Sequence, residues 1–104
     1  MLAGSAGTIA ALVNVTPNLH GELYKLFKEG KIEEAMALQA ALGHGDWAIS
    51  KLGGIAGVKA VVSRSFGYGS GSVRGPLKVV PEEGLKNNAY YNKLQTLIEE
   101  EKKL

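Results

Sequence analysis

The sequence predicts a mainly α-helical chain with one short strand near its N-terminus. Four segments carry apolar side chains at intervals of three and four residues, which is the period of an amphipathic helix. Only one short apolar run, Thr8–Val13, has the β-branched character of a strand. Fourteen glycines fall mostly at segment ends and in one loop, so they separate the elements. With 104 residues, the chain has the length of one domain.

The stretch GSAGTIAALVNV contains the predicted strand. A continuous apolar run of this length, preceded by Gly4 and Gly7, is typical of a strand buried on both faces, although Ala and Leu also permit a helix. Every backbone N–H and C=O group of a buried strand needs a partner. Because no other segment reads as a strand, Thr8–Val13 either is not a strand or pairs with strands outside this chain.

Helices are predicted on both sides of Gly30. Thr16 is expected to cap the first helix, with Pro17 at its first position and Leu19, Leu23, Leu26 and Phe27 on its apolar face. A second helix begins near Ile32 and meets the sequence GHG at residues 43–45. The sequence predicts either one kinked helix or two helices there, with Asp46 capping the second.

The C-terminal half contains two more predicted helices and a long connection. The third helix covers Ile55–Phe66, and FGYGSGSVRGPLKVVP follows as an irregular link in which Arg74 is expected to tie the loop down, with ligand binding as the alternative. After Pro81, a final helix has an apolar stripe, and its EEEKK end is expected to be solvated. The stripe contains Tyr90, Tyr91, Leu94, Leu97 and Ile98.

Charge and composition limit the classes of partner. Twelve basic and ten acidic side chains leave a net charge of +2 without a basic cluster, so nucleic acid is not expected. The absence of cysteine excludes disulfides and thiolate zinc sites and fits an intracellular compartment. The longest apolar run is too short to span a bilayer, and we expect no membrane partner.

The sequence contains no strong motif for a cofactor or a metal. GSAGTIA and GYGSGSVRG lack the G-x-G-x-x-G spacing and the strand-to-helix context of a dinucleotide site. His20 and His44 have no ligand spacing to carboxylates, so ordinary polar or capping roles are favoured and no metal is expected. Lys59 is expected to reach solvent rather than act as a buried nucleophile. Trp47, Tyr68, Tyr90 and Tyr91 are interpreted as packing residues.

Several segments together resemble the pyruvate-dependent class I aldolases and lyases, which include dihydrodipicolinate synthase, N-acetylneuraminate lyase and 4-hydroxy-2-oxoglutarate aldolase. The similarity extends over nearly the whole chain. GTIAALVNVTPN is similar to the last barrel strand of that family, LYKLFKEGKIEEAMALQ to the helices that follow it, and GIAGVKAVVSRSFGYGSGSVRGPL to its C-terminal helical region. The FGYG and R-x-P-L elements lie nearest the 4-hydroxy-2-oxoglutarate and 2-keto-3-deoxy-acid aldolases.

The resemblance implies a (β/α)8 TIM barrel with added C-terminal helices. Gly7–Val13 would be the eighth strand, within a barrel-closing segment and exit loop at residues 1–15, and residues 16–104 would form the helical region. Gly7, Thr8 and Ile9 match the backbone that lines the keto-acid pocket. The family's imine-forming lysine, keto-acid motif and relay tyrosine belong to other strands, so we expect no catalytic residue and no cofactor in this chain.

The expected function is therefore that of a C-terminal fragment of a Schiff-base-forming 2-keto-acid aldolase, active only in the complete enzyme. Its expected partner is the remainder of the barrel or a second copy, with Ile9, Leu12 and Val13 at the contact. The expected compartment is the cytoplasm, or the mitochondrion for a full-length relative. The alternative is a small autonomous helical interaction protein.

Overall fold

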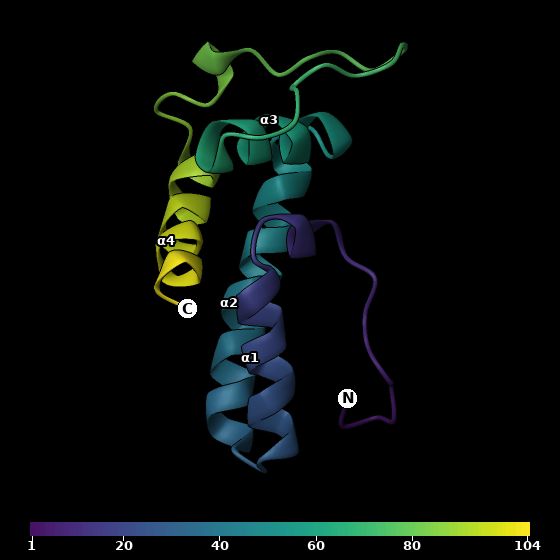
Figure 1. Ribbon diagram of the computed structural model, residues 1–104, viewed down its shortest axis with the longest axis vertical. Coiled ribbons are helices and arrows are strands. Elements are labelled where there is room, and N and C mark those ends of the chain that lie inside the picture. Colours follow the sequence, from purple (N-terminus) through teal and green to yellow (C-terminus); the bar gives the residue numbers. More distant parts are fainter.

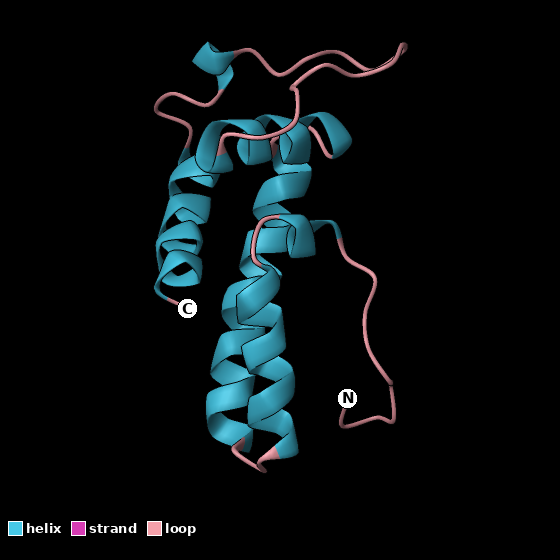
Figure 2. Ribbon diagram, viewed as in Figure 1, coloured by secondary structure: helices cyan, strands magenta, loops and turns pink.

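The computed structural model describes all 104 residues and contains helices but no strand (Figures 1 and 2). The mainly α prediction is therefore confirmed. There are four α-helices and two short 3-10 helices. In chain order they are η1 (Ala11–Asn14), α1 (Pro17–Lys28), α2 (Ile32–Lys51), α3 (Ile55–Phe66), η2 (Glu82–Gly84) and α4 (Ala89–Lys103).

Helix α2 is the centre of the arrangement. It runs antiparallel to α1 along their shared length, while α4 contacts both and α3 crosses at the far end of α2 (Figure 1). The molecule is elongated, with extents of 43 × 25 × 22 Å. The largest fully buried side chains belong to η1, α2, α3, α4 and the link before α1: Leu12, Val15, Thr16, Ile49, Val61, Leu94 and Ile98.

Helix α2 is continuous through the sequence GHG, which excludes the two-helix alternative and the capping role of Asp46. The close packing around Gly45 explains why α2 tolerates glycine at this position. A Cβ atom at this position would lie 2.4 Å from Leu97 Cδ1 and 3.0 Å from Leu12 Cδ2, so glycine allows α4 and η1 to approach α2 closely. The helix accepts the lower propensity of glycine because this approach buries apolar side chains from two other elements.

The long connection between α3 and α4 is held by Arg64 rather than by Arg74. Arg64 on α3 forms an ion pair with Glu82 and lies 5.9 Å from the centre of the Tyr91 ring. Hydrogen bonding to the Glu82 carboxylate raises the pKa of Arg64. Arg74 is exposed and its side chain makes no hydrogen bond or ion pair, so the predicted role of Arg74 as the tie is wrong.

The N-terminus of α1 is capped from the opposite end of the chain. Thr16 occupies the cap position, as predicted, but its hydroxyl donates to the Leu12 carbonyl and does not cap the helix. Instead, both carboxylate oxygens of Glu101 accept backbone hydrogen bonds, from Asn18 and Leu19, each 2.8 Å long. Glu101 is 4% exposed, so the prediction that the whole EEEKK end is solvated is wrong at this residue.

The predicted strand at Thr8–Val13 is absent. The backbone is extended at Ala10 and then enters the 3-10 helix η1, which buries Leu12 in the core at 1% exposure. In contrast, Ile9 is 106% exposed and has no packing partner. A strand requires a partner for its backbone groups, and this chain provides none.

No helix of this structure combines the length and the apolar character that crossing a membrane requires.

Replacing Glu101 with Gln is expected to lower the free energy of unfolding by about 1–3 kcal/mol, because the partly buried N–H of Asn18 and the buried N–H of Leu19 lose a charged acceptor. Glu100→Gln is the matched control on the same helix. Its carboxylate forms an exposed ion pair with Lys103, so a change of at most about 0.5 kcal/mol is expected. Urea denaturation of both variants measures the difference, and equal effects would contradict the capping role.

Alanine in place of Gly57 and of Gly21 should change stability in opposite directions. At Gly57 a Cβ would lie 2.9 Å from the backbone C and O atoms of Leu52, whereas at Gly21 it would meet nothing within 4 Å. Gly21→Ala should therefore stabilise helix α1 by up to about 1 kcal/mol. Gly57→Ala should destabilise by about 1–3 kcal/mol through overpacking, and thermal unfolding curves of the two variants provide the check.

Candidate functional site

The candidate site is a hollow between the extended N-terminal segment and the α1–α2 hairpin. One part, of about 350 Å³, lies beside Ser5, Gly7 and Thr8. A second part, of about 250 Å³, continues toward η1 and the middle of α2. The two parts share Thr8, His20, Leu23 and Gln39, so one polar wall serves both.

His20 is held in one orientation by the turn that begins α1. Its Nδ1 lies 2.7 Å from the Thr16 carbonyl oxygen and 3.3 Å from Thr16 Oγ1. Because a carbonyl oxygen can only accept, Nδ1 carries the proton in this contact. In the neutral ring, Nε2 is then a hydrogen-bond acceptor. This agrees with the first of the two predicted roles, ordinary polar or capping, because His20 makes a local polar contact and caps no helix end.

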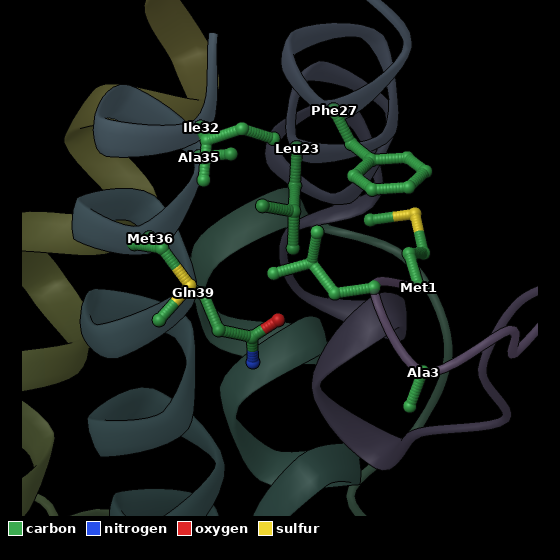
Figure 3. A pocket seen from close by; sticks show the side chains of 9 residues that line it. Met1, Ala3, Leu23, Phe27, Ile32, Ala35, Met36 and Gln39 are labelled. Carbon is green, nitrogen blue, oxygen red and sulfur yellow. The ribbon is translucent and has the colours of Figure 1, made fainter. Parts of the chain in front are cut away.

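An apolar cavity of about 190 Å³ adjoins the polar hollow at the other end of the hairpin. Figure 3 shows the Met1 side chain beside the Phe27 ring, with Leu23 and Gln39 on the facing helices. Met1 packs against the buried core cluster. The start of the chain therefore covers part of the apolar surface of the hairpin, and Gln39 marks the boundary between the apolar and the polar space.

The structure brings two of the three predicted substrate-binding residues to the hollow. Gly7 and Thr8 line it, whereas Ile9 does not and presents its side chain to solvent. All three residues are exposed. No backbone N–H group of residues 5–10 makes a backbone hydrogen bond; Gly7 O accepts one from Ser5 Oγ at 2.8 Å. The backbone of Thr8 and Ile9 is therefore available to other groups.

The hollow has the chemistry of a polar binding surface, and no lysine lines it. Every lysine of the chain, including Lys59, is exposed, and a lysine amine becomes nucleophilic near neutral pH through burial or a neighbouring cation. No group of three or more His, Asp or Glu side chains is placed to hold a metal ion. The imidazole of His20, the Gln39 amide and the Thr8 hydroxyl offer hydrogen bonds to a polar ligand.

Sequence reasoning missed Gln39 and Tyr24 at the hollow, and Glu101 at the cap. Nothing in the sequence marks Gln39 or Tyr24 as a site residue, because each is a polar side chain within an ordinary amphipathic helix. Glu101 did carry a signal. It continues the buried series Tyr91, Leu94 and Ile98 at intervals of three and four residues, which places it on the inner face of α4.

Comparison with known proteins identifies the family. The sequence model of the dihydrodipicolinate synthetase family matches residues 1–98 of this chain. The resemblance drawn from GTIAALVNVTPN and the segments after it is thereby confirmed.

Three fungal aldolases are among the similar proteins. An L-threo-3-deoxy-hexylosonate aldolase of Hypocrea jecorina is 38% identical over 78 residues, which cover 75% of this chain and 24% of that protein. A probable mitochondrial 4-hydroxy-2-oxoglutarate aldolase of Emericella nidulans is 35% identical over 69 residues, which cover 66% of this chain and 22% of that protein. An L-threo-3-deoxy-hexylosonate aldolase of Aspergillus niger is 32% identical over 104 residues, which cover 100% of this chain and 30% of that protein.

No solved structure matches the chain. The chain spans 22–30% of the length of the three aldolases. On the extent of the family match, this chain belongs to the dihydrodipicolinate synthetase family.

Proposed function

We propose that this chain supplies the last strand and the supporting helices of a (β/α)8 barrel that cleaves or condenses a 2-keto acid. Family membership and the aldolase names of the similar proteins support the reaction class. The observation that carries the proposal is the state of the segment before η1. It is extended at Ala10, its N–H groups at residues 5–10 have no backbone partner, and Ile9 is 106% exposed.

These features are those of a strand without its sheet. An extended segment with free N–H groups is a template for pairing with another strand. A fully exposed isoleucine would bury its side chain among the strands of a barrel interior, which is filled by branched apolar residues. Pairing of Gly7–Ala10 with a neighbouring strand on each side would give its backbone N–H and C=O groups hydrogen-bond partners and would also bury Ile9.

The proposed chemistry uses a lysine amine that lies elsewhere in the complete enzyme. The amine attacks the ketone carbon of the 2-keto acid, water leaves, and the resulting iminium accepts the electron pair of the carbon–carbon bond that breaks. In this proposal the residues of this chain position the substrate and take no part in bond making or breaking. The backbone at Gly7, Thr8 and Ile9 would line the keto-acid pocket, which agrees with the general placement of barrel active sites at strand ends.

The alternative of an autonomous helical interaction protein is not favoured. The similarity to aldolases extends over 66–100% of the chain, and the family model matches residues 1–98. The compartment, cytoplasmic or mitochondrial, stays a prediction.

Incubated with pyruvate and borohydride, this chain alone is expected to gain no covalent mass, because all its lysines are exposed. Intact-mass spectrometry measures the outcome. The complete aldolase of Hypocrea jecorina is the positive control and should be trapped at one lysine. Stoichiometric trapping at Lys59, or at any other single lysine of this chain, would overturn the assignment of the imine-forming lysine to another part of the enzyme.

Ile9→Asn should weaken binding of this chain to the remainder of the Hypocrea jecorina aldolase, meaning the residues of that protein outside the shared region. Loss of a buried isoleucine side chain costs about 2 kcal/mol, so about a thirtyfold rise in Kd is expected. Ile55→Asn is the matched control, since Ile55 is 65% exposed on a different element. Leu12 is unsuitable for this test because it belongs to the core. Titration calorimetry giving equal Kd values for the two variants would contradict the proposed role of Ile9.

A further inference from the structure

A groove of about 340 Å³ lies between helices α2 and α4. Each helix contributes three residues at the spacing i, i+3, i+4, which share one face of a helix. They are Ala41, His44 and Gly45 of α2 and Lys93, Thr96 and Leu97 of α4. A space of this volume can hold a small organic molecule.

The groove is separate from the hollow beside the N-terminal segment. The two spaces share no lining residue, and the groove shares none with the apolar cavity at the other end of the hairpin. Successive residues of an α-helix are turned by about 100°. Gly43 and Asp46 therefore face the hollow from one side of α2. His44 and Gly45 face the groove from nearly the opposite side.

The floor of the groove is apolar and closely packed. Gly45 is buried, and Ala41 and Leu97 are partly buried. A Cβ atom at Gly45 would lie 2.4 Å from Leu97 Cδ1, so the two helices meet directly beneath the groove. The hydrogen bonds of Glu101 to the start of α1 also hold α4 in place. The groove is therefore formed in the free chain, as is usual for sites that bind small molecules.

Three polar side chains lie at the opening of the groove, namely His44, Lys93 and Thr96. All three are exposed, and none makes a side-chain hydrogen bond or ion pair within the chain. Each of them can donate a hydrogen bond. No Asp or Glu lines the groove, and Glu100, which follows on this face of α4, is paired with Lys103 at 2.8 Å. The opening therefore offers donors and positive charge to an anion.

The lining determines the chemical class of that anion. One lysine beside a hydroxyl and an imidazole can balance a single negative charge, and a carboxylate accepts hydrogen bonds from several donors through its two oxygens. The apolar floor favours a short hydrocarbon next to this charge. A phosphate dianion would carry more charge than one ammonium group balances, and it has no apolar part for the floor.

We propose that the groove between α2 and α4 binds a small monocarboxylate with a short hydrocarbon chain. Lys93, Thr96 and His44 hold the carboxylate, and the hydrocarbon lies over Gly45 and Leu97. This site lies outside the hollow and takes part in no step of the proposed reaction. It therefore goes beyond the proposed function and does not depend on it.

Titration of the isotope-labelled chain with butyrate, followed by the NMR shifts of its backbone amides, tests the site. Butyrate combines one carboxylate with a propyl chain. The amides of His44, Gly45 and Lys93 should shift saturably, with a Kd on the order of 1–10 mM, whereas those of His20 and Gln39 at the hollow should not. 1-Butanol, which lacks the charge, and inorganic phosphate, which lacks the hydrocarbon, should each bind at least about tenfold more weakly.

Lys93→Gln removes the positive charge and should raise the Kd for butyrate by at least about fivefold. Lys86→Gln is the matched control, because Lys86 is exposed, forms no ion pair and does not line the groove. A change of less than about twofold is expected there. Circular dichroism verifies that both variants fold.

Ala41→Leu tests the apolar part without changing any charge. Leucine favours a helix nearly as much as alanine, so α2 should persist while the larger side chain fills the groove. Saturable binding of butyrate should be lost. Ala37→Leu, at an exposed position of α2 outside the groove, should keep it.

Absence of saturation up to about 100 mM butyrate would overturn the site, as would shifts at His20 and Gln39 in place of the groove. Equal Kd values for butyrate and either 1-butanol or phosphate would overturn the ligand class. Equal effects of Lys93→Gln and Lys86→Gln would overturn the assignment of the carboxylate to Lys93. Failure of the proposed aldolase role is seen separately, as absence of binding to the remainder of the Hypocrea jecorina aldolase.

Discussion

The carboxylate of Glu101 at the N-terminus of α1 is the interaction on which the rest of the structure depends. Helix α1 begins without a side-chain cap of its own, and Pro17 at its first position has no N–H. Glu101 accepts the next two N–H groups, and the N–H of His20 bonds to the Thr16 carbonyl. Every donor of the first turn is thereby satisfied. Because the acceptor lies 82 and 83 residues away in sequence, this contact fixes α4 against α1 and encloses the core formed with α2.

This closed helical core contrasts with the open segment that precedes it. From Leu12 onward the chain is tied into the core, since η1 contacts α1, α2 and α3. At residues 5–10 the backbone N–H groups have no backbone partners, and Ile9 lies in solvent. The change from residues that pack within this chain to residues that lack backbone partners therefore takes place over two or three residues. A piece of a barrel would have this property if its helices pack among themselves and its strand packs on other strands.

Much of the helical architecture could be predicted from local sequence, because the spacing of apolar residues marks each helix and glycines mark its ends. Ile55–Phe66 has the predicted bounds, and the ends near Gly30 and Ile32 agree, since glycine and apolar spacing act over a few residues. No strand forms at Thr8–Val13 in this chain, because pairing is a property of the sheet and not of this run. Glu101 was missed because the charge of its neighbours outweighed its position on the stripe of Tyr91, Leu94 and Ile98. At the hollow, Gly7 and Thr8 are the residues to which the resemblance pointed and their binding role stays a prediction, whereas Gln39 reaches the hollow only through the packing of α2 on α1.

Amide hydrogen exchange at Thr8, Ile9 and Ala10 tests the central claim most directly, namely that this segment is a barrel strand awaiting its neighbours. In the free chain these amides should exchange at nearly the rate of an unfolded peptide, because they have no backbone partner. On addition of the remainder of the Hypocrea jecorina aldolase, they should become protected together with a smaller change in α1 and α4. The matching segment of that aldolase, mixed with the same remainder, is the control. Protection of the control segment without any at Thr8–Ala10 of this chain would contradict the account.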